Sequence, residues 1–156
     1  MKAKEGVLEQ LNHILTAELT AIHQYLLHAG LCQNWGYERL HEYYSHLAND
    51  EMQHSAGLVH HILYLDGTPE MERLESVTHG KDVTALFRAD LEFEREDVEL
   101  LRTAIAHCAT VGDFTTRHLL EHMLEDTEGH IDWFETRLRT IDQVGLERFL
   151  SEQIKK

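Results

Sequence analysis

The sequence contains very little proline, cysteine or positive charge, and it has no long apolar run. Pro69 is the only proline among 156 residues. Because proline is the residue that most disrupts a helix, its scarcity leaves room for long helices. The apolar stretches are only a few residues long, which excludes a membrane-spanning helix. The proportions of 42% hydrophobic and 27% charged residues are those of a globular protein.

The two cysteines, Cys32 and Cys108, are too few and too far apart for a disulfide framework or a thiolate metal motif. We expect both to be buried as small apolar residues. The segment from Met1 to Glu5 lacks the apolar core of a signal peptide, so a cytoplasmic protein is expected.

Basic residues are scarce, with 14 Lys and Arg against 28 Asp and Glu, and the formal charge is −14. This charge argues against nucleic acid and anionic membrane surfaces as partners, and it favours cations. A surplus of charge that serves only solubility has the same composition, so charge alone does not decide between the two.

Apolar residues recur at every third or fourth position along most of the chain, which is the pattern of amphipathic helices. The pattern predicts one domain over 1–156 with four long helices and a short fifth helix. The expected long helices cover about 8–35, 37–65, 83–112 and 119–145, and the short one runs from Leu146 to Ile154. The connections near 35 and 112 are very short, which forces antiparallel neighbours. The connection from Asp66 to Lys81 is long enough to cross the whole bundle. An all-α, four-helix bundle with one long crossover is the ferritin-like arrangement.

Two one-turn motifs stand on the second and fourth expected helices, Glu51-Met52-Gln53-His54 and Thr127-Glu128-Gly129-His130. Residues three apart on a helix share a face, so a Glu and a His at this spacing reach one metal ion. Di-iron sites in ferritin-like bundles use two Glu-x-x-His motifs and one Glu from each of the other two helices. The second motif here has Thr127 in place of its Glu.

Glu18 and Glu94 supply the expected carboxylates of the first and third helices, because each interrupts an apolar stripe. A single such Glu usually extends to solvent, and a single buried His is usually hydrogen-bonded. Three carboxylates converging in a core, with no Lys or Arg in the same stripes, are costly unless a cation offsets their charge. Oxygen and imidazole ligands suit iron, manganese or zinc.

Several segments of the sequence resemble bacterioferritins, and the resemblance extends along the whole chain. The matching segments are Leu19–Tyr25, Asn34–Gly36, Asp50–His54, Ile62–Gly67 and Glu128–Trp133. The resemblance implies a hollow shell of twenty-four subunits that stores iron. It also implies a ferroxidase centre that oxidises Fe(II) with oxygen or peroxide.

The resemblance also assigns roles to individual residues of the predicted di-iron site. Glu18 and Glu94 would be terminal ligands, His54 and His130 would each supply an imidazole, and Glu51 would bridge the two irons. Thr127 stands where the family has its second bridging Glu. A threonine hydroxyl is neutral and a poor ligand, so we expect an incomplete centre with weak or absent ferroxidase activity in the homopolymer.

Met52 lies about 100° around the helix from Glu51, so it should point away from the core, toward a neighbouring subunit. It fits an ordinary interface, but the resemblance implies that Met52 and its two-fold mate ligate the iron of haem b.

Three further residues have two interpretations each. Tyr25 would donate an electron or a hydrogen bond to the di-iron site, or it is a core aromatic. His46 and Asp50 resemble an inner-surface iron site, or they are a solvated pair.

The resemblance, with Met52 present and Thr127 in place of a Glu, implies a haem-carrying bacterioferritin subunit that shares its shell with a second, ferroxidase-competent subunit. A small ferredoxin-type protein would supply electrons for iron release through the haem. One alternative is a fully active ferroxidase with altered ligation. The other is a bundle like those of rubrerythrin relatives, without a shell and with a polar core that is only hydrogen-bonded.

Overall fold

The structure, a computed structural model, describes residues 1–155, and these form five helices and no strand. The helices are α1 (Val7–Asn34), α2 (Glu38–Tyr64), α3 (Val83–Val111), α4 (Phe114–Val144) and α5 (Leu146–Ser151). The predicted all-α class, with four long helices and a short fifth one, is confirmed. None of these helices has a stretch long and apolar enough to cross a membrane.

Two predicted helix ends were wrong. Helix α4 begins at Phe114 rather than near Leu119, because Asp113 caps it: the Asp113 carboxylate accepts a hydrogen bond from the Thr116 backbone N–H at 3.0 Å. The apolar pattern that marked this helix starts later than its cap. Helix α5 ends at Ser151, before Ile154.

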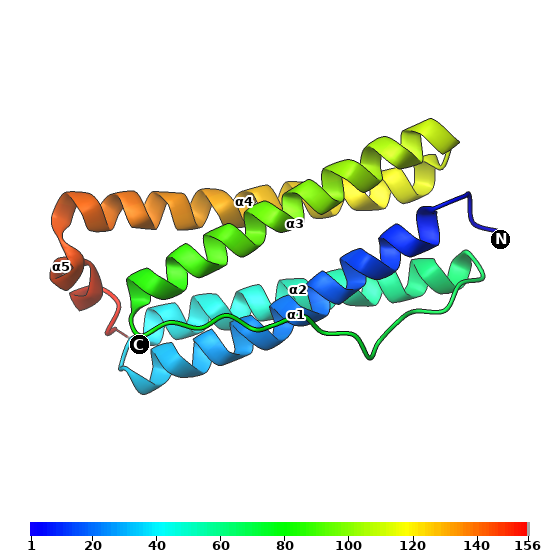
Figure 1. Cartoon of the computed structure of the whole chain (residues 1–156). Coiled ribbons are helices and arrows are strands. Elements are labelled where there is room, and N and C mark those ends of the chain that lie inside the picture. Colours follow the sequence, from blue (N-terminus) through cyan, green and yellow to red (C-terminus); the bar gives the residue numbers. More distant parts are fainter. Residues whose placement is uncertain (156) are drawn as a thin grey trace.

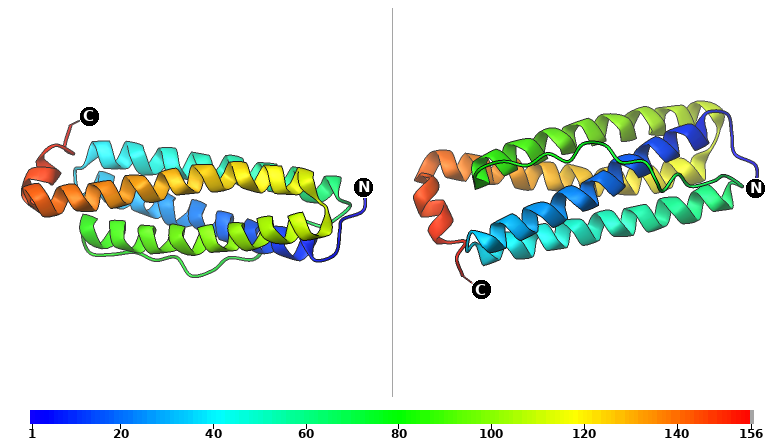
Figure 2. Two further views of the ribbon diagram at one scale, coloured as in Figure 1. Left: turned by 90° about the horizontal axis from the view of Figure 1, so that it is seen from above. Right: turned by 60° about the horizontal axis from the view of Figure 1, so that its bottom comes forward.

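The four long helices form two antiparallel pairs, α1 with α2 and α3 with α4 (Figure 1). The chain leaves α2 at one end of the bundle and returns along the outside to start α3 at the other end (Figure 2). As a result α2 and α3 run in the same direction, as the predicted long crossover requires.

The crossover lies on α1 because polar side chains of that helix bind its backbone. Asn12, Thr20 and Gln24 accept hydrogen bonds from three crossover N–H groups at 2.8–2.9 Å. These contacts satisfy backbone groups of a segment that has no secondary structure of its own.

The apolar core consists of two clusters toward the two ends of the bundle. One cluster is rich in aromatic rings, including Tyr44, Phe87 and Phe134, and the other consists mostly of leucines. Cys32 lies in the first cluster and Cys108 in the second, and both are buried, as predicted. Between the two clusters every long helix buries polar side chains, namely Glu18, Glu51, Glu94 and His130 among others, which places a polar layer at mid-bundle.

Candidate metal centre

The polar layer at mid-bundle contains the five predicted ligands. The residues Glu18, Glu51 and Glu94 are each 1% exposed. Together with two histidines they form two groups in which one ligand atom of each residue lies within 4.8 Å of the others. One group is Glu18, Glu51 and His54, and the other is Glu51, Glu94 and His130. Because Glu51 belongs to both, the groups form two adjacent halves of one site.

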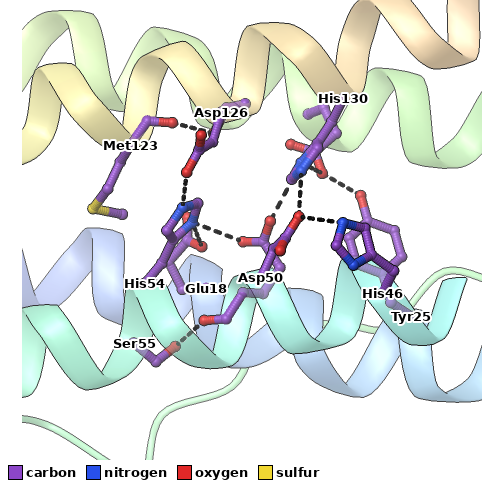
Figure 3. Close-up of polar contacts among 12 residues, drawn as sticks. Glu18, Tyr25, His46, Asp50, His54, Ser55, Met123, Asp126 and His130 are labelled. Atoms are coloured by element: carbon purple, nitrogen blue, oxygen red, sulfur yellow. Dashed lines mark hydrogen bonds and ion pairs between the residues drawn. The ribbon is translucent and has the colours of Figure 1, made fainter. Parts of the chain in front are cut away.

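The two histidines approach the site in the same way. Nδ1 of His54 lies 3.3 Å from Glu18 and 3.7 Å from Glu51, while its Nε2 lies 2.8 Å from Asp126 (Figure 3). Nδ1 of His130 lies 3.4 Å from both Glu51 and Glu94. Each ring therefore directs one nitrogen into the site, and an acid holds the nitrogen of His54 that faces outward.

His130, in the other half of the site, also has a carboxylate near its outer nitrogen. Its Nε2 lies 3.4 Å from Asp50 (Figure 3). An imidazole that donates its outer N–H to a carboxylate presents the lone pair of the other nitrogen, which is the usual arrangement of metal-binding histidines.

Several buried polar atoms of the site lack hydrogen-bond partners, namely Glu18 Oε1, Glu51 Oε1, Asp97 Oδ1 and His130 Nδ1. Buried polar atoms are nearly always hydrogen-bonded, so unpaired atoms concentrated in one layer require an explanation. The ion pairs of the site carboxylates within residues 1–155 involve histidines and no Lys or Arg. A bound cation would satisfy these atoms and offset their charge. Three carboxylates and two imidazoles suit iron, manganese or zinc.

Burial and mutual repulsion shift the pKa values of the site carboxylates. Burial, and after it the charge of Glu51, raises the pKa of Glu18 well above its ordinary value. Burial also raises the pKa of Glu94, although the interaction with His130 opposes this. For Glu51, burial acts upward, but its interactions with Glu18 and His54 and the charge of both histidines lower its pKa.

The histidines hold protons that a metal would displace. Burial acts to lower the pKa of each ring, but the interaction with neighbouring carboxylates outweighs it. The pKa rises to about 9 for His54, chiefly through Glu51, and to about 9 for His130, chiefly through Glu94. Without metal, these protons partly neutralise the carboxylates, so metal binding must release them.

Thr127 is fully buried within this layer, and its hydroxyl donates a hydrogen bond to the carbonyl oxygen of Met123 at 2.9 Å. The side chain is therefore bound to its own helix. The neighbouring Asp126 does not replace the missing carboxylate, because it binds the outer nitrogen of His54 and belongs to neither group.

Tyr25 is fully buried and donates its hydroxyl hydrogen to Glu94 Oε1. Burial, followed by the charge of Glu94, raises the pKa of Tyr25 well above its ordinary value, so the hydroxyl keeps its proton. The residue thus lies in the aromatic cluster and also contacts the site, and both interpretations from the sequence fit its position.

The other predicted residues lie outside the two groups. Nε2 of His46 is 3.6 Å from Asp50, and the His46 side chain is largely exposed. Met52 is 56% exposed, so it points away from the core as its helical position predicts.

Sequence reasoning missed two buried acids on α3, Asp90 and Asp97. Asp90 lies four residues before Glu94 and Asp97 lies three after it, so helical spacing places both on the same face as Glu94. That spacing was the available signal, but Asp97 stands in a charged run, Glu92 to Glu99, whose other acids apart from Glu94 are exposed.

The sequence matches the ferritin-like domain over residues 8–144. It is 42% identical to a bacterioferritin of Streptomyces coelicolor, over all of this chain and 93% of the relative. It is 39% identical to a bacterioferritin of Mycolicibacterium paratuberculosis, over all of this chain and 98% of the relative. A bacterial ferritin of Synechocystis is 37% identical, over 99% of both chains. The helical bundle, its polar layer and these similarities agree: the chain belongs to the ferritin-like proteins, within the bacterioferritin family.

Proposed function

We propose that the protein is an iron-storage subunit of the bacterioferritin type that has an incomplete ferroxidase centre. The observation that supports this most directly is the pair of buried groups that share Glu51. The iron would be the substrate. Glu18 and His54 would hold one Fe(II), Glu94 and His130 the other, and electrons would pass from iron to oxygen or peroxide.

The identity of residue 127 limits this oxidation. A bridging carboxylate holds two ions at a fixed spacing and balances the charge that they gain on oxidation. The Thr127 hydroxyl has no charge and is hydrogen-bonded to Met123. Glu51 is then the only bridging carboxylate, and paired oxidation in the homopolymer is weak or absent.

We further propose that Met52 ligates haem b together with the Met52 of a second copy. In the single chain this thioether is exposed, whereas Glu51 beside it is buried. The exposure suits a ligand that two subunits share at an interface. A thioether is a soft ligand that stabilises Fe(II) haem, and the haem would supply electron transfer.

The physiological arrangement that follows is a cytoplasmic, twenty-four-subunit shell that contains a second bacterioferritin subunit with a complete ferroxidase centre. The second subunit would oxidise Fe(II), and the chain described here would conduct electrons from a small ferredoxin-type donor for iron release. An exposed inner-surface iron site at His46 and Asp50 would assist mineral growth.

The test is Fe(II) oxidation by the purified shell, followed by stopped-flow absorbance. Thr127→Glu is expected to raise the initial rate at least about tenfold by restoring the second bridge. Thr103→Glu, which adds the same charge at an exposed position of α3, should leave the rate unchanged. Rapid oxidation by the original protein that Thr127→Glu does not increase would establish the alternative, a fully active ferroxidase. A monomer or dimer in size-exclusion chromatography would contradict storage in a shell.

A further inference from the structure

Asp97 is a buried carboxylate at the site that the di-iron pattern does not include. It lies on α3, one turn after Glu94, and is 3% exposed. Its Oδ1 has no hydrogen-bond partner. An aspartate is rarely buried unless it is paired or binds a metal. No Lys or Arg is paired with it among residues 1–155, so its burial is otherwise unexplained.

The parallel direction of α2 and α3 places Asp97 beside one half of the site. The step from Glu51 to His54 and the step from Glu94 to Asp97 both advance about 4.5 Å in the same direction along the bundle. The electrostatics agree with this position. Burial and the charge of Glu94 raise the pKa of Asp97 to about 8, while Glu18 and the charge of His54 act to lower it. Asp97 therefore lies beside the Glu18–His54 half of the site.

The number of carboxylates also supports a role for Asp97. The ferritin-like di-iron pattern has four glutamates. This chain has Glu18, Glu51 and Glu94 at three of those positions and lacks the fourth at Thr127. With Asp97, which lies on α3 rather than on α4, the buried layer again contains four carboxylates. The negative charge available to two cations is thus restored, although the second bridge is not.

We propose that Asp97 is a terminal carboxylate ligand of the metal ion held by Glu18 and His54. This inference rests on the proposed function, since it assumes that the layer binds metal. The two groups with all ligand atoms within 4.8 Å do not include Asp97, so ligation requires its carboxylate to turn toward the ion. The resulting site is unequal: the Glu18–His54 half gains a ligand, and the Glu94–His130 half does not.

The structural test uses Zn(II), which is not oxidised, and the assembled protein. Anomalous diffraction from zinc-soaked crystals should show zinc in the Glu18–His54 half with an Asp97 oxygen at about 2.0–2.2 Å. Zinc in that half with Asp97 bonded to Glu18 and outside ligand distance would overturn the proposal, as would zinc only in the Glu94–His130 half. Absence of zinc from both halves would instead refute the metal centre itself.

The second measurement is calorimetric titration of Zn(II) into two variants, each of which removes one negative charge. Asp97→Asn preserves the shape of the side chain and should weaken the tighter zinc site at least about tenfold. Glu96→Gln, at the exposed neighbouring position, should leave both affinities unchanged. Equal affinities in the two variants would contradict ligation by Asp97. The crystallographic distance gives the answer independently if Asp97→Asn fails to fold.

Discussion

Nε2 of His54 on α2 lies 2.8 Å from Oδ2 of Asp126 on α4. This contact joins two helices that belong to different antiparallel pairs. It also holds a proton on the outer nitrogen, so that Nδ1 can offer its lone pair to a metal ion held by Glu18 and Glu51 once its own proton has left. The equivalent contact of His130, with Asp50, is longer at 3.4 Å. The Glu18–His54 half is therefore the better organised of the two.

Asp126→Asn is expected to weaken zinc binding in the Glu18–His54 half about 10–100-fold, which is the usual effect of removing a carboxylate behind a metal-binding histidine. Calorimetric titration measures the change. Asp132→Asn, at an exposed position of the same helix, is the control. If the two variants bind zinc equally well, the His54–Asp126 contact does not orient the ligand.

The sequence predicted the bundle and its crossover because those follow from apolar periodicity and from the lengths of the connections. It also predicted that Glu18, Glu51 and Glu94 converge, since each interrupts an apolar stripe. The roles of Asp97 and Asp126 depend instead on which helices pack against α3 and α4 and at what height. Side chains of the same type at neighbouring positions, such as Glu96, are exposed. Helical spacing separates Asp97 from Glu96, but only the relative position of the helices shows which residues Asp97 and Asp126 face.

Asp90 is the acceptor of a second buried network that the sequence did not reveal. It accepts hydrogen bonds from Gln24 at 2.7 Å, from Tyr44 at 2.5 Å and from His28 Nδ1 at 2.8 Å. The other nitrogen of His28 lies 2.7 Å from the Thr78 carbonyl oxygen. The network thus connects α1, α2 and α3 to the crossover.

Asp90→Ala is expected to lower the free energy of unfolding by about 3–5 kcal/mol, because it leaves three buried donors without their acceptor. Denaturant titration measures the loss. Asp142→Ala, at an exposed position of α4, should change the free energy of unfolding by less than about 0.5 kcal/mol. A loss below 1 kcal/mol for Asp90→Ala would mean that water replaces the network at little cost.

The metal-free protein is expected to become less stable as pH rises from about 6.5 to 9. The folded state raises the pKa of His54 and His130 from 6.5 to about 9, so it binds more protons than the unfolded state in that window. Their stabilisation is complete below 6.5 and is lost as pH passes about 9. Asp97, with its pKa raised from 3.8 to about 8 by burial and by the charge of Glu94, acts in the same direction.

Thermal unfolding in the presence of a chelator measures this effect. We expect the midpoint to fall by at least about 4 °C between pH 6.5 and 9, which corresponds to roughly 1–2 kcal/mol for a domain of this size. Saturating zinc should reverse most of the fall, since it replaces the protons that are lost. A midpoint that rises with pH in the metal-free protein would mean that the two imidazoles are not protonated in the folded state.

Met52→Leu is expected to abolish haem binding while leaving the fold intact, because leucine keeps the apolar volume but has no sulfur to ligate iron. Met71→Leu is the matched control, since Met71 is similarly exposed (53% against 56% for Met52) but lies in the crossover. The absorption spectrum of each purified variant, after reconstitution with haem b, gives the haem content per subunit. The original protein and Met71→Leu should bind one haem for every two subunits and show the spectrum of a bis-methionine haem. Retention of that spectrum by Met52→Leu would exclude Met52 as the axial ligand and, with it, the proposed route for electrons into the shell.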